Sequence, residues 1–382
     1  MLYIHCSSLC TPTRQIVDAG ILLDGGRIVS LGPASAMEFP ASTQVLDAGG
    51  LTAVPGYIDW QFNGGFGHDF TADPTSIWEV GARLPEHGVT AFLPTIITAP
   101  AGKYSAAQAV LRAGPPPGYH GAWPLGLHFE GPFLNPGKKG AHDPAYLRLA
   151  TATEIKDWSR RKHVWLVTLA PELPGAPEAI RLLRSRGVVV SAGHSLATIE
   201  QAVSAFERGV TAGTHLFNAM PALDHRAPGL AAALLVSQRV TTGLIPDGIH
   251  VHPAMVALAW GQKRPAKMAI VTDAMGALGM PPGNYLLGGF NVRVDETSAR
   301  LEDGTLAGSI LRMDQAVRNL MDFTGCSLRE AVTAATLNVA RLLGSRRKGR
   351  LVPGADADLL LLDEHARVAV TIAAGEVLHN TL

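Results

Sequence analysis

The feature that most constrains the fold is a series of short apolar runs that recurs through the middle of the chain. Each run is bounded by Gly, Pro or polar residues and is followed by sequence of helical character. Continuous runs of this kind are typical of strands buried on both faces of a parallel sheet. Eight strand and helix units predict an α/β fold, specifically a (β/α)8 TIM-like barrel. The runs are residues 57–62, 91–97, 126–130, 164–169, 188–194, 213–217, 241–245 and 268–273.

The two ends of the chain differ in character from the middle. The segment ILLDGGRIVSLG offers two short β runs around an Asp-Gly turn, and the C-terminal sequence has the same character. Neither end alone has enough strands to bury an apolar face. We therefore expect residues 1–54 and 349–382 to pair into one small β-sandwich domain, with residues 55–348 forming the barrel.

The composition fits a large buried core and no broad electrostatic partner. The chain has 382 residues, of which 47% are hydrophobic and 17% charged, and its 32 basic and 32 acidic residues balance. We expect no binding to nucleic acid or to an anionic membrane. Cys6, Cys10 and Cys326 lack metal-ligand spacing, the first residues do not resemble a signal peptide, and the apolar stretches are shorter than the roughly 18 residues that cross a bilayer. These features favour a soluble protein of the reducing cytoplasm.

Polar side chains stand at the ends of several predicted strands, where a barrel of this type carries its chemistry. Glu130, His194 and His215 end three of the runs, and Asp273 ends a fourth. A carboxylate with two imidazoles is a hydrolytic zinc set with an open position, and a nearby Asp is suited to carry protons. Taken singly, each residue has a structural alternative. Glu130 and Asp273 could cap helices, His194 could be a hydrogen-bonded core residue, and His215 could hold a loop.

A series of motifs resembles, in order, that of the N-acetylglucosamine-6-phosphate deacetylases of the amidohydrolase superfamily. The resemblance covers residues from about 47 to 360, and the conjunction of the motifs is specific although each one alone is weak. It implies that Glu130, His194 and His215 hold one divalent metal ion. The motifs are PGYIDWQFNGGFG, GLHFEGPFLNPGKKGAH, VTLAPE, SAGHSLAT, GTHLFNAMPAL with HRAPGLAAALL, DGIHVHP, VTDAM and GTLAGSIL.

The first strand argues for a single metal ion. Many members of the superfamily carry His-x-His there and bind two metals, whereas this chain has Gln61 and Asn63. Amides are poor ligands for zinc, and the fourth run, VWLVTLAPE, offers no lysine to bridge two ions. We expect one ion, with Gln61 reaching it through water at most. Zinc suits the ligand set best, although iron, cobalt or manganese could substitute.

Amide hydrolysis requires an activated water, a stabilised oxyanion and a proton for the departing amine. We expect the metal to activate the water and to contribute part of the stabilisation of the oxyanion. Asp273 is expected to take the proton from water and pass it to the amine. The resemblance implies that His250 polarises the acetyl carbonyl opposite the metal, although His252 lies two positions further on.

The resemblance also implies how the substrate is held. Asn218 and Ala219 would contact the sugar phosphate, and Arg226 would reach the phosphate from the neighbouring subunit of a homodimer, since guanidinium matches phosphate geometry. Gly137 and Gly140 are expected to make the GKKGAH turn flexible enough to act as a lid over the sugar. The alternative for Arg226 is a solvated charge, which is the interpretation that we prefer for Lys138 and Lys139. The remaining expected pocket residues are Ala141, His142, Asp247, Gly248, Ile249, His250, Leu306, Ala307 and Gly308, flanked by Thr305 and Ser309.

The sequence therefore predicts a metal-dependent enzyme that removes acetate from N-acetylglucosamine 6-phosphate. Within enzymes, the alternatives are the galactosamine epimer or another small amide. A different class of alternative is a catalytically silent barrel that serves as an assembly subunit. The retention of Glu130, His194, His215 and Asp273 argues against that last possibility.

Overall fold

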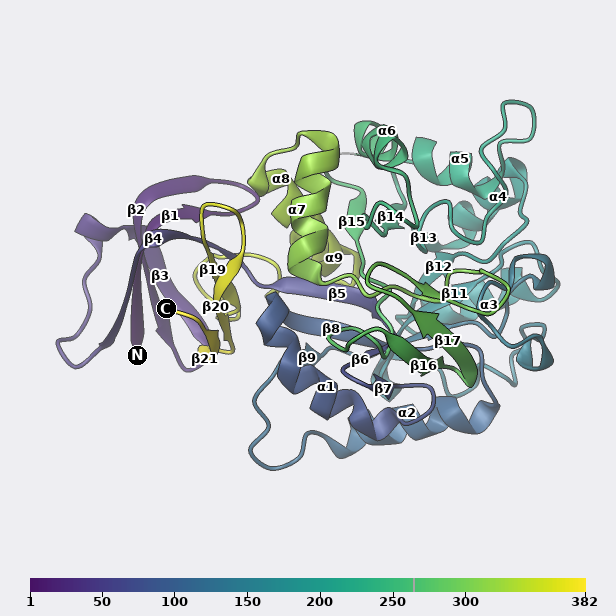
Figure 1. Cartoon of the computed structure of the whole chain (residues 1–382), viewed down its shortest axis with the longest axis horizontal. Helices are drawn as coiled ribbons and strands as arrows, with labels where there is room; N and C mark the ends of the chain where they lie inside the picture. Colours follow the sequence, from purple (N-terminus) through teal and green to yellow (C-terminus); the bar gives the residue numbers. More distant parts are fainter. Residues whose placement is uncertain (264) are drawn as a thin grey trace.

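The computed structural model describes residues 1–263 and 265–382, and it contains a barrel beside a smaller β domain (Figure 1). In the described chain the barrel has eight parallel strands, as the apolar runs predicted. Hydrogen bonds from Asp273 N to Gln61 O (3.0 Å) and from Asn63 N to Ala274 O (2.8 Å) close the barrel between its last and first strands. The strands are β5 (Tyr57–Phe62), β8 (Val89–Ile96), β10 (Leu127–Glu130), β11 (Val164–Leu169), β12 (Val189–Ala192), β13 (Val210–Gly213), β14 (Thr241–Leu244) and β15 (Met268–Ile270).

Three predicted runs extend two or more residues past the strand ends in the structure. Strands β12 and β15 end before the runs 188–194 and 268–273 do, and the run 213–217 overlaps β13 only at Gly213. His194, His215 and Asp273 have φ values of 49°, 26° and 51°, so the chain leaves the extended conformation before reaching them. The apolar pair after His215 suggested a strand, but it lies in a turn. The true strand VTAG begins earlier and is too polar for an apolar-run criterion.

Helices surround the barrel strands and bury their apolar faces against them. The strands are buried on both sides; every residue of β5 and β8 is buried, including the polar Asp59 and Gln61. Capping boxes start α4, with Thr198 and Gln201, and α8, with Ser327 and Glu330. The helices are α1 (Ile77–Arg83), α2 (Ala101–Ala113), α3 (Ala176–Ser185), α4 (Ile199–Arg208), α5 (Gly229–Val236), α6 (Pro253–Lys263), α7 (Met313–Thr324), α8 (Leu328–Ala335) and α9 (Leu337–Leu342).

The two ends of the chain form one sheet, and both termini lie in it (Figure 1). Seven strands follow the order β21-β20-β19-β4-β1-β2-β3, with β1 and β4 parallel and the other neighbours antiparallel. Strands from both ends share one apolar core, which explains why neither end needs to be stable alone. The strands are β1 (Leu2–Cys10), β2 (Gln15–Asp24), β3 (Arg27–Pro33), β4 (Gln44–Pro55), β19 (Leu359–Leu362), β20 (Val368–Ala373) and β21 (Glu376–Asn380).

A three-stranded antiparallel sheet that the sequence did not predict is inserted between β15 and α7. It consists of β16 (Gly283–Leu287), β17 (Phe290–Val294) and β18 (Ala299–Arg300). Its apolar side packs on Ile97 and Met275. Asp69 Oδ2 accepts a hydrogen bond of 2.5 Å from Gly288 N, which fastens the β16–β17 turn to the barrel. Shorter strands are β6 (Gly64–Gly65), β7 (His68–Asp69) and β9 (Trp123–Pro124).

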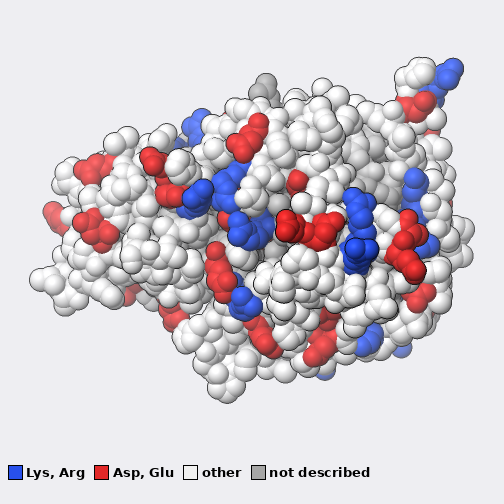
Figure 2. Space-filling model, in the orientation of Figure 1, with Lys and Arg blue, Asp and Glu red and all other residues white. Residues whose placement is uncertain are grey.

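The surface carries both signs of charge. Acidic and basic side chains are interspersed on the face shown in Figure 2, and neither sign forms a broad patch there. Among the described helices, none combines the length and apolarity needed to span a membrane.

Candidate active site

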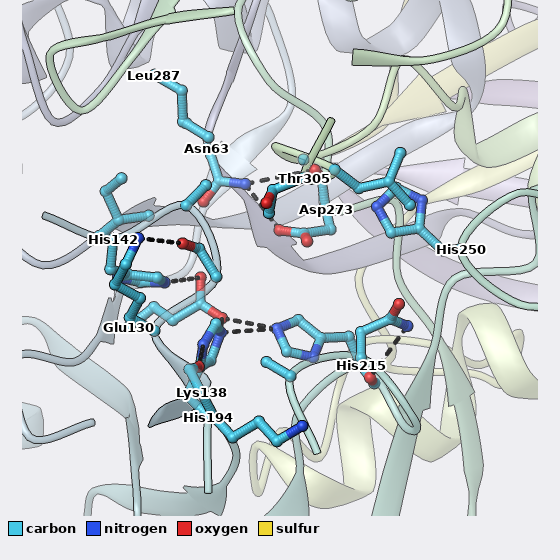
Figure 3. A pocket seen from close by; sticks show the side chains of 18 of the residues that line it. Asn63, Glu130, Lys138, His142, His194, His215, His250, Asp273, Leu287 and Thr305 are labelled. Atoms are coloured by element: carbon cyan, nitrogen blue, oxygen red, sulfur yellow. Dashed lines mark hydrogen bonds and ion pairs between the residues drawn. The ribbon is translucent and has the colours of Figure 1, made fainter. Parts of the chain in front are cut away.

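A cavity of about 500 Å³ opens where the barrel strands end (Figure 3). This volume suits a small molecule. Its wall comes from the segments after most of the barrel strands, from the 136–142 loop and from the inserted sheet. The lining residues are Asn63, Ile97, Glu130, Pro136, Gly137, Lys138, Lys139, Gly140, Ala141, His142, His194, His215, Asn218, Ala219, His250, Asp273, Leu287, Asp303, Thr305, Leu306 and Gly308.

Three buried side chains converge at the floor of this cavity. Glu130 is the last residue of β10, and His194 and His215 follow β12 and β13. Glu130 Oε1 lies 3.2 Å from His194 Nε2 and 3.1 Å from His215 Nε2, and the two nitrogens are 3.0 Å apart. All three ligand atoms lie within 4.8 Å of one another. A carboxylate and two imidazoles that point at one centre can hold a divalent metal ion and leave a position free.

His194 and His215 determine the charge of Glu130, and the neutral ring of His142 lies beside them. Burial alone would raise the pKa of Glu130, but hydrogen bonds from His194 and His215 outweigh it and hold this pKa well below its usual value. Burial lowers the pKa of His142 to about 3, so this ring is neutral. Its Nδ1 accepts a hydrogen bond from Thr98 N, which leaves the proton on Nε2, 3.9 Å from Glu130 Oε2.

Asp273 lies above the metal group and is held by two amides. Its Oδ1 accepts hydrogen bonds from Asn63 Nδ2 at 2.8 Å and from Gln61 Nε2 at 3.1 Å. The Gln61 amide also donates to Glu130 Oε1 at 2.9 Å, so it bridges the two carboxylates. Burial, with a smaller contribution from the charge of Glu130, raises the pKa of Asp273 to about 6. A carboxyl with a pKa near neutrality can both take and return a proton.

His250 lines the cavity and lies beyond Asp273 as seen from Glu130 (Figure 3). Asp247 Oδ2 lies 2.6 Å from His250 Nδ1, and Asp247 Oδ1 accepts from the backbone of Ile249 and His250. Burial would raise the pKa of Asp247, but its hydrogen bond with His250 and the other contacts lower it. Asp247 therefore fixes the ring so that His250 Nε2 is free for a ligand. His252, the alternative, is exposed and does not line the cavity of the described chain.

The other residues expected to bind substrate fall into two groups. Ala307 is fully buried in the core of the inserted sheet, and Arg226 is exposed on the 221–228 loop. Those that line the cavity are Ala141, His142, Asn218, Ala219, His250, Leu306 and Gly308. Those that lie outside its wall in the described chain are Arg226, Asp247, Gly248, Ile249 and Ala307.

Sequence reasoning missed four lining residues, Ile97, Pro136, Leu287 and Asp303. Ile97 follows β8, and its apolar character made it look like part of the strand. Leu287 ends β16, directly before Gly288 and Gly289, which have φ values of 57° and 99°. A Gly-Gly pair between alternating residues is a hairpin signal that could have found this insertion.

Asp59 is a fully buried carboxyl beneath the site. Its Oδ2 accepts a hydrogen bond of 2.5 Å from Thr272 Oγ1, which ties β5 to the residue before Asp273. Burial raises the pKa of Asp59 to about 7.

This pKa predicts a pH-dependent effect of Asp59→Asn on stability. A carboxyl whose pKa is higher in the folded state than in the unfolded state, where it is about 3.9, favours folding when protonated. Its contribution is therefore complete below about pH 4 and is lost as the pH rises through about 7. Because Asn does not ionise, the variant should gain in unfolding free energy relative to the wild type by up to about 1.4 kcal/mol per pH unit in this window. Denaturant unfolding of both proteins at several pH values measures the difference, and a constant difference would contradict the assignment.

Comparisons with known proteins show the family of this chain. The profile of the amidohydrolase family matches residues 52–378. A Bos taurus protein named N-acetylglucosamine-6-phosphate deacetylase is 41% identical over 371 residues, which are 92% of this chain and 90% of the relative.

Solved structures give the same result. The enzyme of that name from Pasteurella multocida superposes with a TM-score of 0.92 at 31% identity, over 99% of this chain and all of the other. A single-site variant of the Mycobacterium smegmatis enzyme, in complex with N-acetyl-D-glucosamine 6-phosphate, superposes with a TM-score of 0.90 at 34% identity, over 99% of each chain. This chain therefore belongs to the amidohydrolase family and, within it, to the N-acetylglucosamine-6-phosphate deacetylases.

Proposed function

We propose that this chain hydrolyses the acetamide of N-acetylglucosamine 6-phosphate to glucosamine 6-phosphate and acetate, using one divalent metal ion. The observation that carries the proposal is the convergence of Glu130, His194 and His215 beside Asp273 in a cavity of small-molecule size. Family membership supports the choice of substrate, since the relatives bear the name of this activity.

Zinc is the metal that this ligand set suits best, with iron, cobalt or manganese as substitutes. The number of ions follows from Gln61 and Asn63. Their amide nitrogens both donate to Asp273 Oδ1, so this carboxylate oxygen is engaged by N–H groups where a second ion would need a free acceptor. We therefore propose one ion per subunit.

Each step of the reaction can be assigned to a group of this chain. The metal, when bound, supplies a Lewis acid that activates water and polarises the acetyl carbonyl. Asp273 takes the proton of the attacking water and gives it to the sugar nitrogen as the C–N bond breaks, so that acetate and a free amine are released. His250, oriented by Asp247, would polarise the carbonyl oxygen as negative charge develops there.

The sugar phosphate is proposed to be held by several of the residues that the sequence assigned to it. Asn218, Ala219, Ala141, His142 and Leu306 line the cavity and can contact the sugar. Gly308 also lines the cavity. Asp247, Gly248 and Ile249 lie behind His250, and Ala307 packs under the inserted sheet. These four residues would shape the cavity wall through the neighbours that they support.

Arg226 is proposed to reach the phosphate of the neighbouring subunit in a homodimer. It is exposed, it lies outside the wall of its own cavity, and no carboxylate pairs with its guanidinium among the described residues. Arg226→Ala should lower kcat/KM for the phosphorylated substrate by about 10- to 100-fold, because a charge-assisted contact of about 1.5–3 kcal/mol is lost. The unphosphorylated sugar should be processed as before.

The measurement is kcat/KM for both sugars in the variant, in the wild type and in Arg208→Ala, which removes an exposed arginine on α4 as a control. An equal loss for the two sugars would refute the phosphate role of Arg226. The homodimer is tested by the same variant. Mixing Arg226→Ala with an Asp273→Asn subunit should restore part of the activity only if the arginine acts across subunits.

The proposed function is tested by acetate release from a panel of N-acetylated hexosamines with the zinc-loaded protein. We expect N-acetylglucosamine 6-phosphate to be the best substrate. A higher kcat/KM for the galactosamine epimer or another amide would change the substrate. The absence of acetate release from the whole panel by fully loaded protein would favour the assembly subunit instead.

Two further proposals concern organisation and location. We infer that residues 1–54 and 349–382 form the small domain and residues 55–348 the barrel, because strands of both ends share one core. We also infer a cytoplasmic location, which is supported by the free thiols of Cys6, Cys10 and Cys326.

A further inference from the structure

Glu172 is a half-buried carboxylate that lies behind the metal group, outside the cavity wall. It follows β11 in the Ala-Pro-Glu segment. Its Oε1 accepts hydrogen bonds from Leu196 N at 2.7 Å and from Asn135 Nδ2 at 2.9 Å, and its Oε2 accepts from Ser195 Oγ at 2.7 Å. In the described chain no cation pairs with it within 4 Å. A carboxylate that gathers three neutral donors from two other segments is suited to holding those segments together.

The two segments both hold His194. Ser195 and Leu196 directly follow it, so two of the three hydrogen bonds fix the backbone on its C-terminal side. Asn135 directly precedes the 136–142 loop of the cavity wall, here called the cavity loop, and its backbone N donates to His194 O at 3.0 Å. His194 has a φ of 49°, a conformation that a residue with a side chain keeps only where its surroundings enforce it. Glu172 supplies part of that enforcement from both sides.

The cavity loop also determines the tautomer of His194. Asn135 Oδ1 accepts from Gly137 N at 2.9 Å and so shapes the turn that contains Lys138. The carbonyl of Lys138 lies 2.9 Å from His194 Nδ1. Because a carbonyl can only accept, Nδ1 carries a proton and Nε2 points toward Glu130 and His215, which leaves Nε2 as the ligand atom when a metal ion is bound. A ligand imidazole that is oriented in this way binds metal better than one left free to rotate.

We propose that Glu172 is a positioning residue for the metal site: it joins the cavity loop to the segment after His194 and thereby holds Nε2 of that imidazole in its ligating direction. The inference rests on the proposed function only in requiring that the three-residue group binds a metal ion. The same contacts fix the start of the cavity loop, which lines the substrate cavity. Metal affinity and substrate affinity should therefore weaken together when Glu172 is removed.

The test is the dissociation constant for Zn²⁺, measured by competition with a chromophoric chelator on the full chain. Glu172→Ala removes both acceptor oxygens and with them all three hydrogen bonds, and it should raise this constant by about 10- to 100-fold, the usual effect of losing an orienting partner of a ligand. KM should rise in the same variant. Glu172→Gln keeps an oxygen for Leu196 N and Asn135, and its amide can donate to Ser195 Oγ. It should stay within about threefold of the wild type.

Glu178→Ala is the matched control, because it removes the same charge from an exposed position on α3. It should leave the zinc constant unchanged. If Glu172→Ala does not fold, as judged by circular dichroism and Tm, Ser195→Ala and Asn135→Ala each remove one of the contacts and should raise the constant by about three- to tenfold.

Three results would overturn the proposal. The first is a zinc constant within twofold of the wild type in folded Glu172→Ala or, in its place, in both single-contact variants. The second is an equal loss in Glu178→Ala, and the third is an equal loss in Glu172→Gln and Glu172→Ala, which would assign the effect to charge. Zinc binding is measured without substrate. A failure of the proposed function in the acetate-release test can therefore be told apart from a failure of the role proposed for Glu172.

Discussion

Asp273→Asn should lower kcat by about 10²- to 10⁴-fold, the range expected when a general acid and base is lost. Asn has nearly the same shape as Asp. Its carbonyl oxygen can still accept from Asn63 and Gln61, which donate to Asp273 Oδ1 in the wild type. The amide cannot carry a proton between water and the leaving nitrogen. Zinc affinity and KM should change little, so the loss should lie in kcat. Steady-state kinetics and chelator competition measure the two effects separately.

The control for this variant is Asp157→Asn, which changes an exposed carboxylate that pairs with Lys162 away from the cavity. It should be as active as the wild type. Turnover of Asp273→Asn within a few fold of the wild type would remove the proposed proton carrier. A large rise in its zinc constant would instead move Asp273 from proton transfer to metal binding.

His215→Ala should abolish tight zinc binding and lower activity by about 10³-fold or more. The missing ligand leaves one imidazole and one carboxylate, which is too few for a stable site in this fold. A bound metal stabilises the charge of the transition state by several kcal/mol, and a loss of about 4 kcal/mol corresponds to a 10³-fold lower rate. Wild-type protein treated with a strong chelator should lose activity to the same level. It should recover on addition of zinc, whereas the variant should not.

His365→Ala serves as the control, since this exposed histidine lies in the small domain and pairs only with Glu364 at 3.6 Å among the described residues. It should bind one equivalent of zinc and retain full activity. The role of His215 would be refuted if stoichiometric zinc restored the variant to wild-type turnover.

The barrel could be predicted because burial on both faces leaves a direct trace in the sequence. Runs such as those of β5 and β8 are mostly apolar, and each is buried throughout. The three metal-site residues were also predictable, since they are the ionisable groups at the ends of such runs. The structure brings Glu130, His194 and His215 together as expected.

Other features depend on contacts that no local pattern encodes. The ends of β12, β13 and β15 were misplaced because His194, His215 and Asp273 adopt positive φ values that only the folded site enforces. The inserted sheet and its Leu287 follow from packing on Ile97, a residue far away in sequence. The contacts of Asp59 with Thr272 and of Glu172 with Asn135 likewise join separate strands. Each of these carboxylates looks like an ordinary polar residue in the sequence.

Glu130, His194 and His215 are proposed to hold a single metal ion, and anomalous diffraction at the zinc edge from crystals grown with excess zinc would locate it. We expect one peak per chain in this cavity, within about 2.0–2.2 Å of Glu130 Oε1 and of Nε2 in both imidazoles. A peak of equal height beside Gln61 and Asn63, or a cavity without zinc whose three side chains point apart, would contradict it.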